Sequence, residues 1–462
     1  MKWRTIGFVL GLSLLVCIPA LAANKAVQVG PPGGVDDTEI LQNALNQCIS
    51  PNGGCTVQLS AGTYVTKQLF TQNFSGTIKG MGMDKTSIEA YAPLPVTDAI
   101  PWWSGPQNLW PELIRFQDGD ISIADLAIRF TAPVTTTEWY LDDAGQVEVH
   151  ELLGVLGVFG ASANLSLKRV KVEGGFADEM TPWGRLNAQY AVFAEPETTA
   201  LSGTLSVKSS VFLNVNCAVT FVGLDSSKVT IGGSPSTGNR FEDVEAPILL
   251  AAFENSLSEV SYNDIIRTNW EGIWVAPALW GPSQTASKFV VQHNNITVIP
   301  TYGVDLGWWP DAIDIWDEDW DDPPSIKSEF IVSNNTIQLS HDTSFGIAAI
   351  QDVGSIISNN QISGVGWAGI WLDGSTQDML LGNNVARFIA EETPFGTFAP
   401  IWLWDNTSNN TVVGGNNLTS AVDLGTSNTL VGVNNMQGNP PGPAVRDAMK
   451  RKIEMLKAMR KP

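Results

Sequence analysis

Gly369-Ile370-Trp371 is one copy of a short phrase that recurs along this chain. Each copy has a small residue or a proline first, an apolar residue second, and a third residue that varies. The other copies are Ala191-Val192-Phe193, Ala218-Val219-Thr220, Pro247-Ile248-Leu249, Gly272-Ile273-Trp274, Ala312-Ile313-Asp314, Gly346-Ile347-Ala348 and Pro400-Ile401-Trp402. Neighbouring copies lie 23 residues (Gly346 to Gly369) to 40 residues (Gly272 to Ala312) apart. Self-similarity at such intervals predicts stacked repeats, in which equivalent positions form columns.

The segment before the repeats predicts a helix over residues 36–49. Asp36 or Asp37 can cap its start, and apolar residues recur at helical spacing on one face. Those residues are Ile40, Leu41, Ala44, Leu45 and Cys48. A helix placed before stacked strands would cover their open hydrophobic end, which otherwise pairs with other chains.

Paired asparagines precede an apolar position in the second half of the chain. The pairs are Asn294-Asn295, Asn334-Asn335, Asn359-Asn360 and Asn383-Asn384. Asparagine tolerates left-handed backbone and hydrogen-bonds to its own turn. Stacked asparagine side chains also hydrogen-bond from one layer to the next. We therefore expect these pairs to form turns with a ladder of amide side chains.

The opening segments DDTEILQNALNQC (36–48) and GGCTVQLSAGTY (53–64), with the asparagine turns, resemble the right-handed parallel β-helix of the pectin-lyase-like superfamily. The resemblance implies an all-β right-handed parallel β-helix, a solenoid over residues 23–442 with an N-terminal capping helix. It also implies one of several activities: polysaccharide lyase, glycoside hydrolase, uronan epimerase or non-enzymatic adhesin. The characteristic motifs of polygalacturonases and alginate epimerases are absent.

The first 22 residues have the features of a secretory signal peptide. Lys2 and Arg4 are basic, 6–18 is apolar, and Ala20-Leu21-Ala22 is a small-x-small cleavage site. No later apolar run in the sequence is long enough to span a bilayer. We expect an exported protein, secreted or periplasmic, and a monomer.

The formal net charge is -21, and removal of the signal makes it more negative. Nucleic acid is excluded as a partner, because its phosphates require basic surface. A polyuronate would also be repelled unless calcium or a local basic patch intervened.

Cysteine and tail composition give two further expectations. Cys48 and Cys55 flank a Pro-Asn-Gly-Gly turn in an oxidising compartment and predict a disulfide, whereas Cys217 predicts a buried free thiol. Residues 443–462 are basic with approximate helical spacing. This short helical tail could cover the end of the solenoid or anchor it to an anionic surface.

Tryptophans gather in the outward columns of the predicted coils, because side chains alternate along each strand. The first outward column reads Phe193, Thr220, Leu249, Trp274, Asp314, Ala348, Trp371 and Trp402, and Trp316 and Trp404 follow two residues later in their coils. A large exposed apolar face marks a binding site, and flat indoles suit sugar rings. The alternative is that loops cover these indoles and make them an ordinary satellite core.

Acidic residues meet in a neighbouring column, formed by the residue just before the small residue of each phrase, which includes Cys217 and Ala246 on earlier coils. Glu271 and Asp311 hold equivalent positions on adjacent coils, and Asp314 follows beside Trp274. Two carboxylates about one strand spacing apart, ~4.8 Å, cannot both ionise easily, so one pKa should rise. That arrangement predicts a general acid beside a base or nucleophile, with Asp373 as a further candidate. A calcium site or solvated loop acids are the alternatives.

Other polar residues give weaker signals. Asp317, Asp319 and Asp321 alternate as in a calcium loop, but the pattern lacks the glycine and the bidentate glutamate of an EF-hand. His341 could reach the groove edge or lie on a surface turn. Arg267 could assist a lyase or pair with nearby acids.

The sequence predicts a protein that binds an extracellular polysaccharide on its outer aromatic face and cleaves it as a glycoside hydrolase. A glycoside hydrolase of this kind requires no cofactor. The alternatives are a calcium-dependent polysaccharide lyase or epimerase, and a binding module without catalysis.

Overall fold

The computed structural model describes most of the chain between residues 25 and 436. The described ranges are 25–49, 54–90, 112–130, 139–141, 147–149, 154–174, 180–181, 184–185, 190–195, 200–268, 271–277, 285–299, 310–317, 326–340, 344–386, 392–393, 396–397, 399–404, 406–415, 418 and 420–436. The predicted signal peptide (1–22) and basic tail (443–462) lie outside these ranges.

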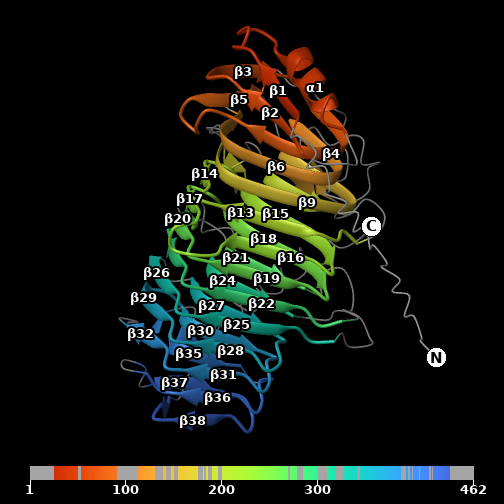
Figure 1. Cartoon of the computed structure of the whole chain (residues 1–462). Helices are drawn as coiled ribbons and strands as arrows, with labels where there is room; N and C mark the ends of the chain where they lie inside the picture. The colour runs from red at the N-terminus through yellow and green to blue at the C-terminus, as the bar shows by residue number, and fades with distance from the viewer. Residues whose placement is uncertain are drawn as a thin grey trace, which may run out of the picture.

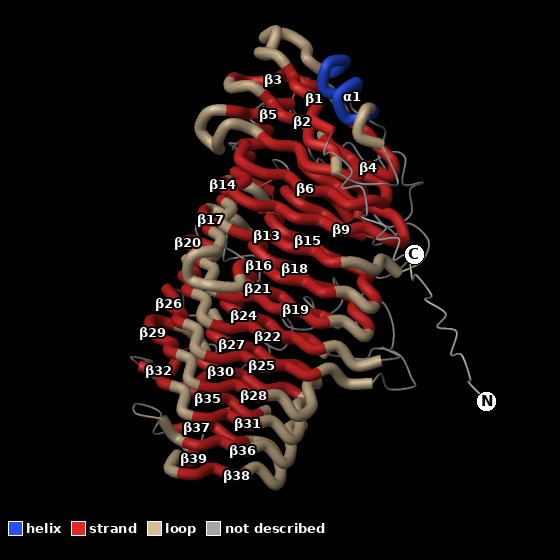
Figure 2. The backbone as a smooth tube through the Cα atoms, in the orientation of Figure 1, coloured by secondary structure: helices blue, strands red, loops and turns tan. Residues whose placement is uncertain are grey.

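Strands from successive coils pair in parallel and form three stacks along the molecule (Figures 1 and 2). The first stack contains β12 (Tyr190–Glu195), β15 (Cys217–Asp225), β18 (Ala246–Glu254), β21 (Glu271–Ala276), β24 (Asp311–Trp316), β27 (Phe345–Ile350), β30 (Ala368–Asp373), β35 (Ala399–Leu403) and β37 (Ser420–Asp423). The described chain is thus a parallel β-helix, as the repeats and the resemblance implied.

The second and third stacks complete each coil. The second contains β13 (Thr204–Lys208), β16 (Lys228–Gly232), β19 (Leu257–Ser261), β22 (Lys288–Gln292), β25 (Glu329–Ser333), β28 (Ile356–Ser358), β31 (Met379–Leu381), β36 (Thr411–Val413) and β38 (Thr429–Val431). The third contains β14 (Val211–Leu213), β17 (Arg240–Glu242), β20 (Asp264–Thr268), β23 (Asn295–Val298), β26 (Thr336–Ser340), β29 (Gln361–Val365) and β32 (Asn384–Ala386).

Seven strands form the first coils, and three of them are longer than any other strand that the structure describes. The seven are β1 (Lys25–Val29), β2 (Cys55–Leu59), β3 (Gly62–Thr66), β4 (Leu69–Lys79), β5 (Thr86–Ala90), β6 (Ile114–Phe130) and β9 (Gly154–Gly174), and β9 pairs with the first strand of all three stacks. The antiparallel pairs among the named strands are short hairpins: β7 (Trp139–Leu141) with β8 (Val147–Val149), β10 (Met180–Thr181) with β11 (Gly184–Arg185), and β33 (Glu392–Thr393) with β34 (Gly396–Thr397). The last strand is β39 (Asn434–Asn435).

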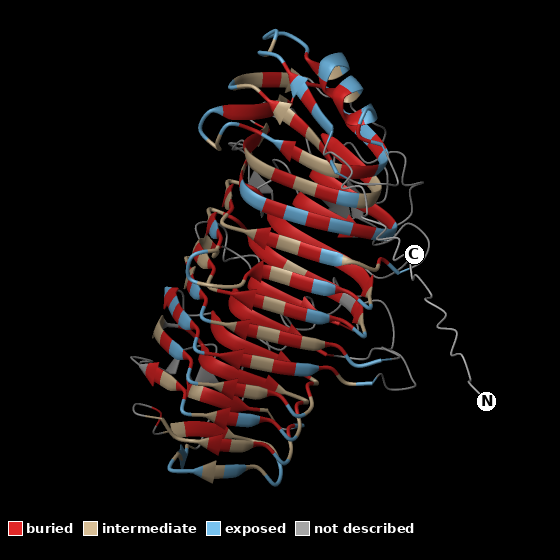
Figure 3. Ribbon diagram, viewed as in Figure 1, coloured by how far each residue is buried: buried red, intermediate tan, exposed pale blue. Residues whose placement is uncertain are grey.

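Alternation along the strands separates the interior from the surface (Figure 3). Inward positions carry Ile, Val, Leu and Phe, and they form one continuous core from Val27 to Ala421. Because each coil packs only on its neighbours, the core can grow with chain length.

The predicted helix is present but shorter than expected. α1 spans Thr38–Asn46 and buries Leu41, Ala44 and Leu45 at the N-terminal end of the stack (Figure 1). Asp37 does not cap it, because its carboxylate accepts hydrogen bonds from the N–H groups of Gly33 (2.7 Å) and Val65 (3.1 Å). Its role as an end cover stays a prediction.

The asparagine ladder is confirmed. Asn294, Asn335, Asn360 and Asn383 stack on successive coils before the third-stack strands, and each of the first three donates its Nδ2 to the next Oδ1 at 3.0 Å. Asn334 and Asn359 adopt left-handed backbone, with φ of 57° and 55°. Both reasons for asparagine therefore apply at these two turns, whereas His293 and Gly382 hold the left-handed position before Asn294 and Asn383.

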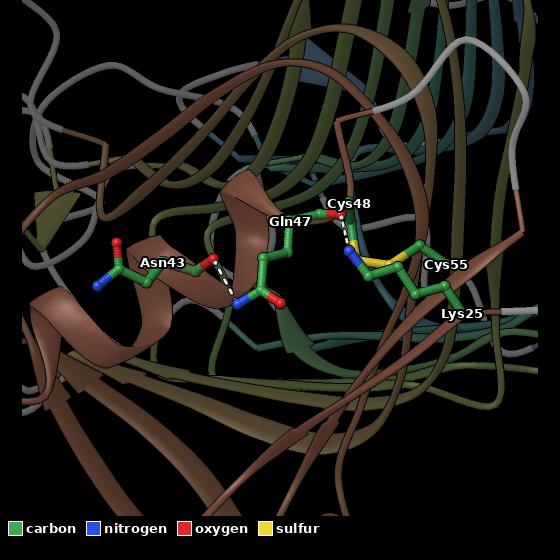
Figure 4. The surroundings of a disulfide bond; sticks show 5 residues. All are labelled: Lys25, Asn43, Gln47, Cys48 and Cys55. Atoms are coloured by element: carbon green, nitrogen blue, oxygen red, sulfur yellow. Dashed lines mark hydrogen bonds between the residues drawn. A yellow bond between two sulfur atoms is a disulfide. The ribbon is translucent and has the colours of Figure 1, made fainter.

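Cys48 and Cys55 form the predicted disulfide, which joins the residues after α1 to β2 (Figure 4). Beside it, Lys25 Nζ donates to the Gln47 carbonyl at 3.0 Å. Cys217 is a buried free thiol, also as predicted. No helix among the described residues is long and apolar enough to cross a membrane.

Replacing Cys48 and Cys55 together by serine should lower the free energy of unfolding of the N-terminal coils. The bridge closes a loop with a sequence separation of 7, for which loop entropy gives about 2–3 kcal/mol. Urea denaturation measures the loss. A thiol count on unreduced, denatured chain lacking 1–22 should detect Cys217 alone, and detection of all three cysteines would exclude the bridge.

Candidate functional site

The predicted outward column of the first stack is confirmed along its full length. Each pair of neighbours is in register: Phe193 with Thr220, Thr220 with Leu249, Leu249 with Trp274, Trp274 with Asp314, Asp314 with Ala348, Ala348 with Trp371, and Trp371 with Trp402. Residues more than 200 positions apart therefore lie on one side of the molecule. We call this side, the outward side of the first stack, the outer face.

The outer face is not the open aromatic wall that the sequence suggested. Trp274, Trp316, Trp371 and Trp402 are buried, with exposed fractions of 2%, 3%, 3% and 0%, and Trp404 is partly buried. They belong to a second hydrophobic cluster, separate from the interior core. The covered-core alternative thus describes their burial, since exposed indoles are costly in water.

Aromatic side chains pack closely at the C-terminal end of this cluster. Phe345 stacks on Trp371 with ring centroids 4.9 Å apart and meets Trp367 edge-on at 5.0 Å. Trp367 in turn stacks on Trp402 at 5.4 Å. The column analysis missed Trp367, because it lies one residue before β30 and outside the repeated phrase.

The predicted acid pair is in register. Glu271 on β21 lies opposite Asp311 on β24, and Trp274 lies opposite Asp314 on the same two strands. Glu271 is 0% exposed, Asp311 is 2% and Asp314 is 0%. Three carboxyls thus lie on adjacent strands away from bulk water, where a carboxyl's environment is set by its neighbours. We call these three residues the acid cluster.

Glu245 and Cys217 lie at the edge of the acid cluster and were not predicted to be part of it. The pKa of the Cys217 thiol is raised by burial and, to a smaller extent, by the carboxylates of Glu245 and Glu271. Glu245 is itself buried, one residue before Ala246, which is in register with Cys217 on the preceding coil. A search for acids one residue before the column that holds Glu271 and Asp311 would have found it.

Of the three acids in the predicted calcium loop, Asp317 alone lies in the described residues, so the loop stays a prediction. Asp317 is 0% exposed, its Oδ2 accepts the Ser328 N–H at 3.0 Å, and Lys327 donates to its carbonyl. These hydrogen bonds hold the turn that follows β24 in place. Asp319 and Asp321 lie outside the described residues, and no group of three or more potential metal-ligating acids, histidines or cysteines occurs among the residues that are described.

The remaining predicted residues are not gathered at the acid cluster. Arg267 lies on β20 in the third stack and pairs with Asp243 at 2.7 Å and Glu242 at 2.6 Å, which is the ion-pair alternative. These bonds raise its pKa further above the ordinary arginine value. Asp373 ends β30, partly buried, opposite Ile350. His341 lies outside the described ranges.

A buried ion pair lies at the N-terminal end of the outer face, and the sequence did not suggest it. Arg115 Nη1 is 3.3 Å from Glu112 Oε2, and the guanidinium lies 3.9 Å above the Phe159 ring. Burial raises the Glu112 pKa to about 7, and Arg115 opposes that rise. Gly154 and Gly157 leave the space for the Glu112 stem, since a Cβ on either would approach it to 2.9 Å.

No known family profile matches the chain, and no curated protein matches it in sequence. Solved structures do match. The surface protein and adhesin PfbA of Streptococcus pneumoniae is 9% identical, with a TM-score of 0.43 over 89% of this chain and 99% of that one.

Two further solved structures are similar at the same level. The Dettilon tailspike protein is 12% identical, with a TM-score of 0.47 over 88% of this chain and 68% of that one. The A-module of the mannuronan C-5 epimerase AlgE4 of Azotobacter vinelandii is 14% identical, with a TM-score of 0.32 over 87% of this chain and 93% of that one. Function depends on the site and is not carried over from these proteins.

Proposed function

We propose that this protein is an exported glycoside hydrolase that binds an extracellular polysaccharide along its outer face. The observation that carries the proposal is the register of Glu271 with Asp311 and of Trp274 with Asp314 on β21 and β24. It brings carboxyls from residues 40 positions apart to adjacent strands, next to an indole. The predicted signal over residues 1–22 supports export.

The chemistry of the acid cluster follows from its geometry. Backbones of paired strands are ~4.8 Å apart, so the carboxyls of Glu271 and Asp311 can flank one glycosidic bond. The protonated member would donate to the leaving oxygen, and the ionised member would act as base or nucleophile. Asp314 and Asp373 are the other acids that we assign to this face. Carboxyls about 5 Å apart would give retention, and a wider separation inversion.

Sugar rings would stack on the indoles of the same face. Trp274 and Trp316 are on the two strands of the acid cluster, and Trp371, Trp402 and Trp404 continue the face over later coils. Because these side chains and the acids are at most partly exposed, the proposal requires that the sugar displace whatever packs over them. Binding is therefore the first property to measure.

A second candidate, a binding module without catalysis, is favoured by that same burial. The acid cluster is at most 2% exposed, so its residues could serve only to pack the outer face. A lyase has less support, because Arg267 is committed to Glu242 and Asp243 and would be a poor base. Calcium is not required by the hydrolase proposal.

Incubation of the chain with neutral glucans and xylans should release new reducing ends if the hydrolase proposal is right. Pull-down on the same insoluble polysaccharides measures binding separately. Binding with no new reducing ends would favour the non-catalytic module. Absorbance at about 235 nm from unsaturated products of polyuronates would instead identify a lyase, because β-elimination leaves a conjugated double bond.

A further inference from the structure

Two buried acids lie in the corner where the first stack turns into the second, away from the outer face. Asp352 follows β27 and Asp378 precedes β31 on the next coil, and both are 0% exposed. Backbone bonds tie the two turns together, since Thr376 N–H donates to the Asp352 carbonyl at 2.9 Å. The proposed function uses neither residue.

Asp378 holds a position that neighbouring coils give to neutral side chains. Its Oδ1 accepts the Ser355 N–H at 2.9 Å, and its own N–H donates to Asn410 Oδ1 at 2.8 Å. Asn410 N–H donates in turn to Asn428 Oδ1 at 2.9 Å. These four residues precede strand positions that are in register, so a carboxyl stands where an amide or hydroxyl would serve.

The hydrogen-bond donors of this corner are neutral groups. Hydrogen bonds from the Ser355 hydroxyl and the Val353 N–H lower the pKa of Asp352, and those from the Ser355 and Gly354 N–H groups lower that of Asp378, but burial outweighs them in both carboxyls. Lys327 is the cation that acts on Asp352. It also donates to the Asp317 carbonyl. Asp317 and the partly buried Asp373 add negative charge in the adjoining turns, so the described charges of the corner are mainly acidic.

We infer that Asp352 and Asp378 share a proton in the folded chain, and that losing it as pH rises loosens the C-terminal coils from β28 onward. Two buried carboxylates on adjacent coils repel each other, and neither is solvated. With the proton present, one carboxyl is neutral and the repulsion between the two is removed. The pair thereby makes the end of the solenoid sensitive to pH.

The direction of the pH effect follows from the two acids. Burial raises the pKa of Asp352 to about 6, and burial together with the charge of Asp352 raises that of Asp378 to about 8. Aspartates in the unfolded chain have pKa values of about 3.9. The folded chain therefore holds protons that the unfolded chain has lost. The stabilisation is complete below about pH 4 and disappears as pH rises through about 8.

Loss of the proton should act locally, because repeat proteins open from their ends and each coil contacts only its neighbours. The described coils beyond Asp378 end at β39, and Val431 in β38 is already 50% exposed. They are few, so a modest repulsion is enough to open them. The N-terminal coils should not respond.

Hydrogen exchange of the full chain at pH 5 and pH 8.5, corrected for intrinsic exchange rates, tests the inference. Protection of β31 and β36 should fall at least about tenfold between these values, since one unit of pKa shift is a factor of ten. Asp378→Asn should abolish most of this fall, because Asn410 shows that an amide fits the position. Asp84→Asn, an exposed acid in the N-terminal coils, is the charge-matched control and should behave as wild type.

Equal protection of wild-type β31 and β36 at the two pH values would overturn the inference, as would the same pH effect in Asp378→Asn and wild type. Asp352→Asn gives a second route if Asp378→Asn does not fold. A calcium titration at pH 8.5 separates a cation from a proton: restoration of wild-type protection by calcium, reversed by chelator, would show that the corner holds a metal ion and refute the shared proton.

Discussion

Replacing Asn335 by alanine will lower the free energy of unfolding by about 3–5 kcal/mol, because several buried groups lose their partners. Asn335 Oδ1 accepts from both the N–H (2.9 Å) and the Nδ2 (3.0 Å) of Asn294, and its Nδ2 donates to the Val291 carbonyl at 3.0 Å. The residue is 0% exposed, so water cannot replace these bonds without opening the coil. Denaturant unfolding followed by tryptophan fluorescence measures the loss.

Asn295→Ala is the matched control for that variant. Asn295 is the neighbouring asparagine and is exposed, and its side-chain Nδ2 donates to Asp264 Oδ1 at 2.8 Å. It should cost less than about 1 kcal/mol, as exposed hydrogen bonds do. Equal losses of unfolding free energy in the two variants would mean that the buried ladder stabilises the chain no more than an exposed hydrogen bond does.

Asp311→Asn and Asp314→Asn should each reduce polysaccharide cleavage by about 10²–10⁴-fold, the usual contribution of general acid–base catalysis. Asparagine keeps the size of the side chain but can neither donate the proton nor accept it as a carboxylate. The thermal unfolding midpoint should change little, because no buried volume is lost. Reducing-end release under substrate saturation is the measurement.

The control for the acid cluster is again Asp84→Asn, which should retain full activity. Full activity in both Asp311→Asn and Asp314→Asn would refute the assignment of the acid cluster, whether or not the chain binds polysaccharide. A variant that loses activity together with its unfolding midpoint would point to a packing role for the carboxyl instead.

The fold and the registry of the columns could be predicted from the sequence because both depend on local chemistry. The repeated phrase sets which residue of each coil points inward, and the register of adjacent coils then places Glu271 beside Asp311. The asparagine pairs fix where each coil turns. The disulfide could be predicted because Cys48 and Cys55 are only seven positions apart.

The bounds of α1 and the partners of several charged residues could not be predicted as well from the sequence. Asp37 looked like a helix cap, yet it bonds to Val65, a residue whose proximity depends on how α1 packs. Arg267 and Glu112 also acquire their surroundings from other coils. Asp352 and Asp378 were not singled out, because an isolated aspartate in a turn gives no sign that a second one will be buried beside it.

Amino-acid order was enough to determine which residues share a column, since strand periodicity and turn chemistry act within one coil and repeat along the chain. Whether a column meets water was decided only by tertiary packing. Trp402 and Asp314 point outward by alternation, yet both are 0% exposed. Side-chain direction is a property of the strand, whereas burial depends on every segment that comes to lie over it.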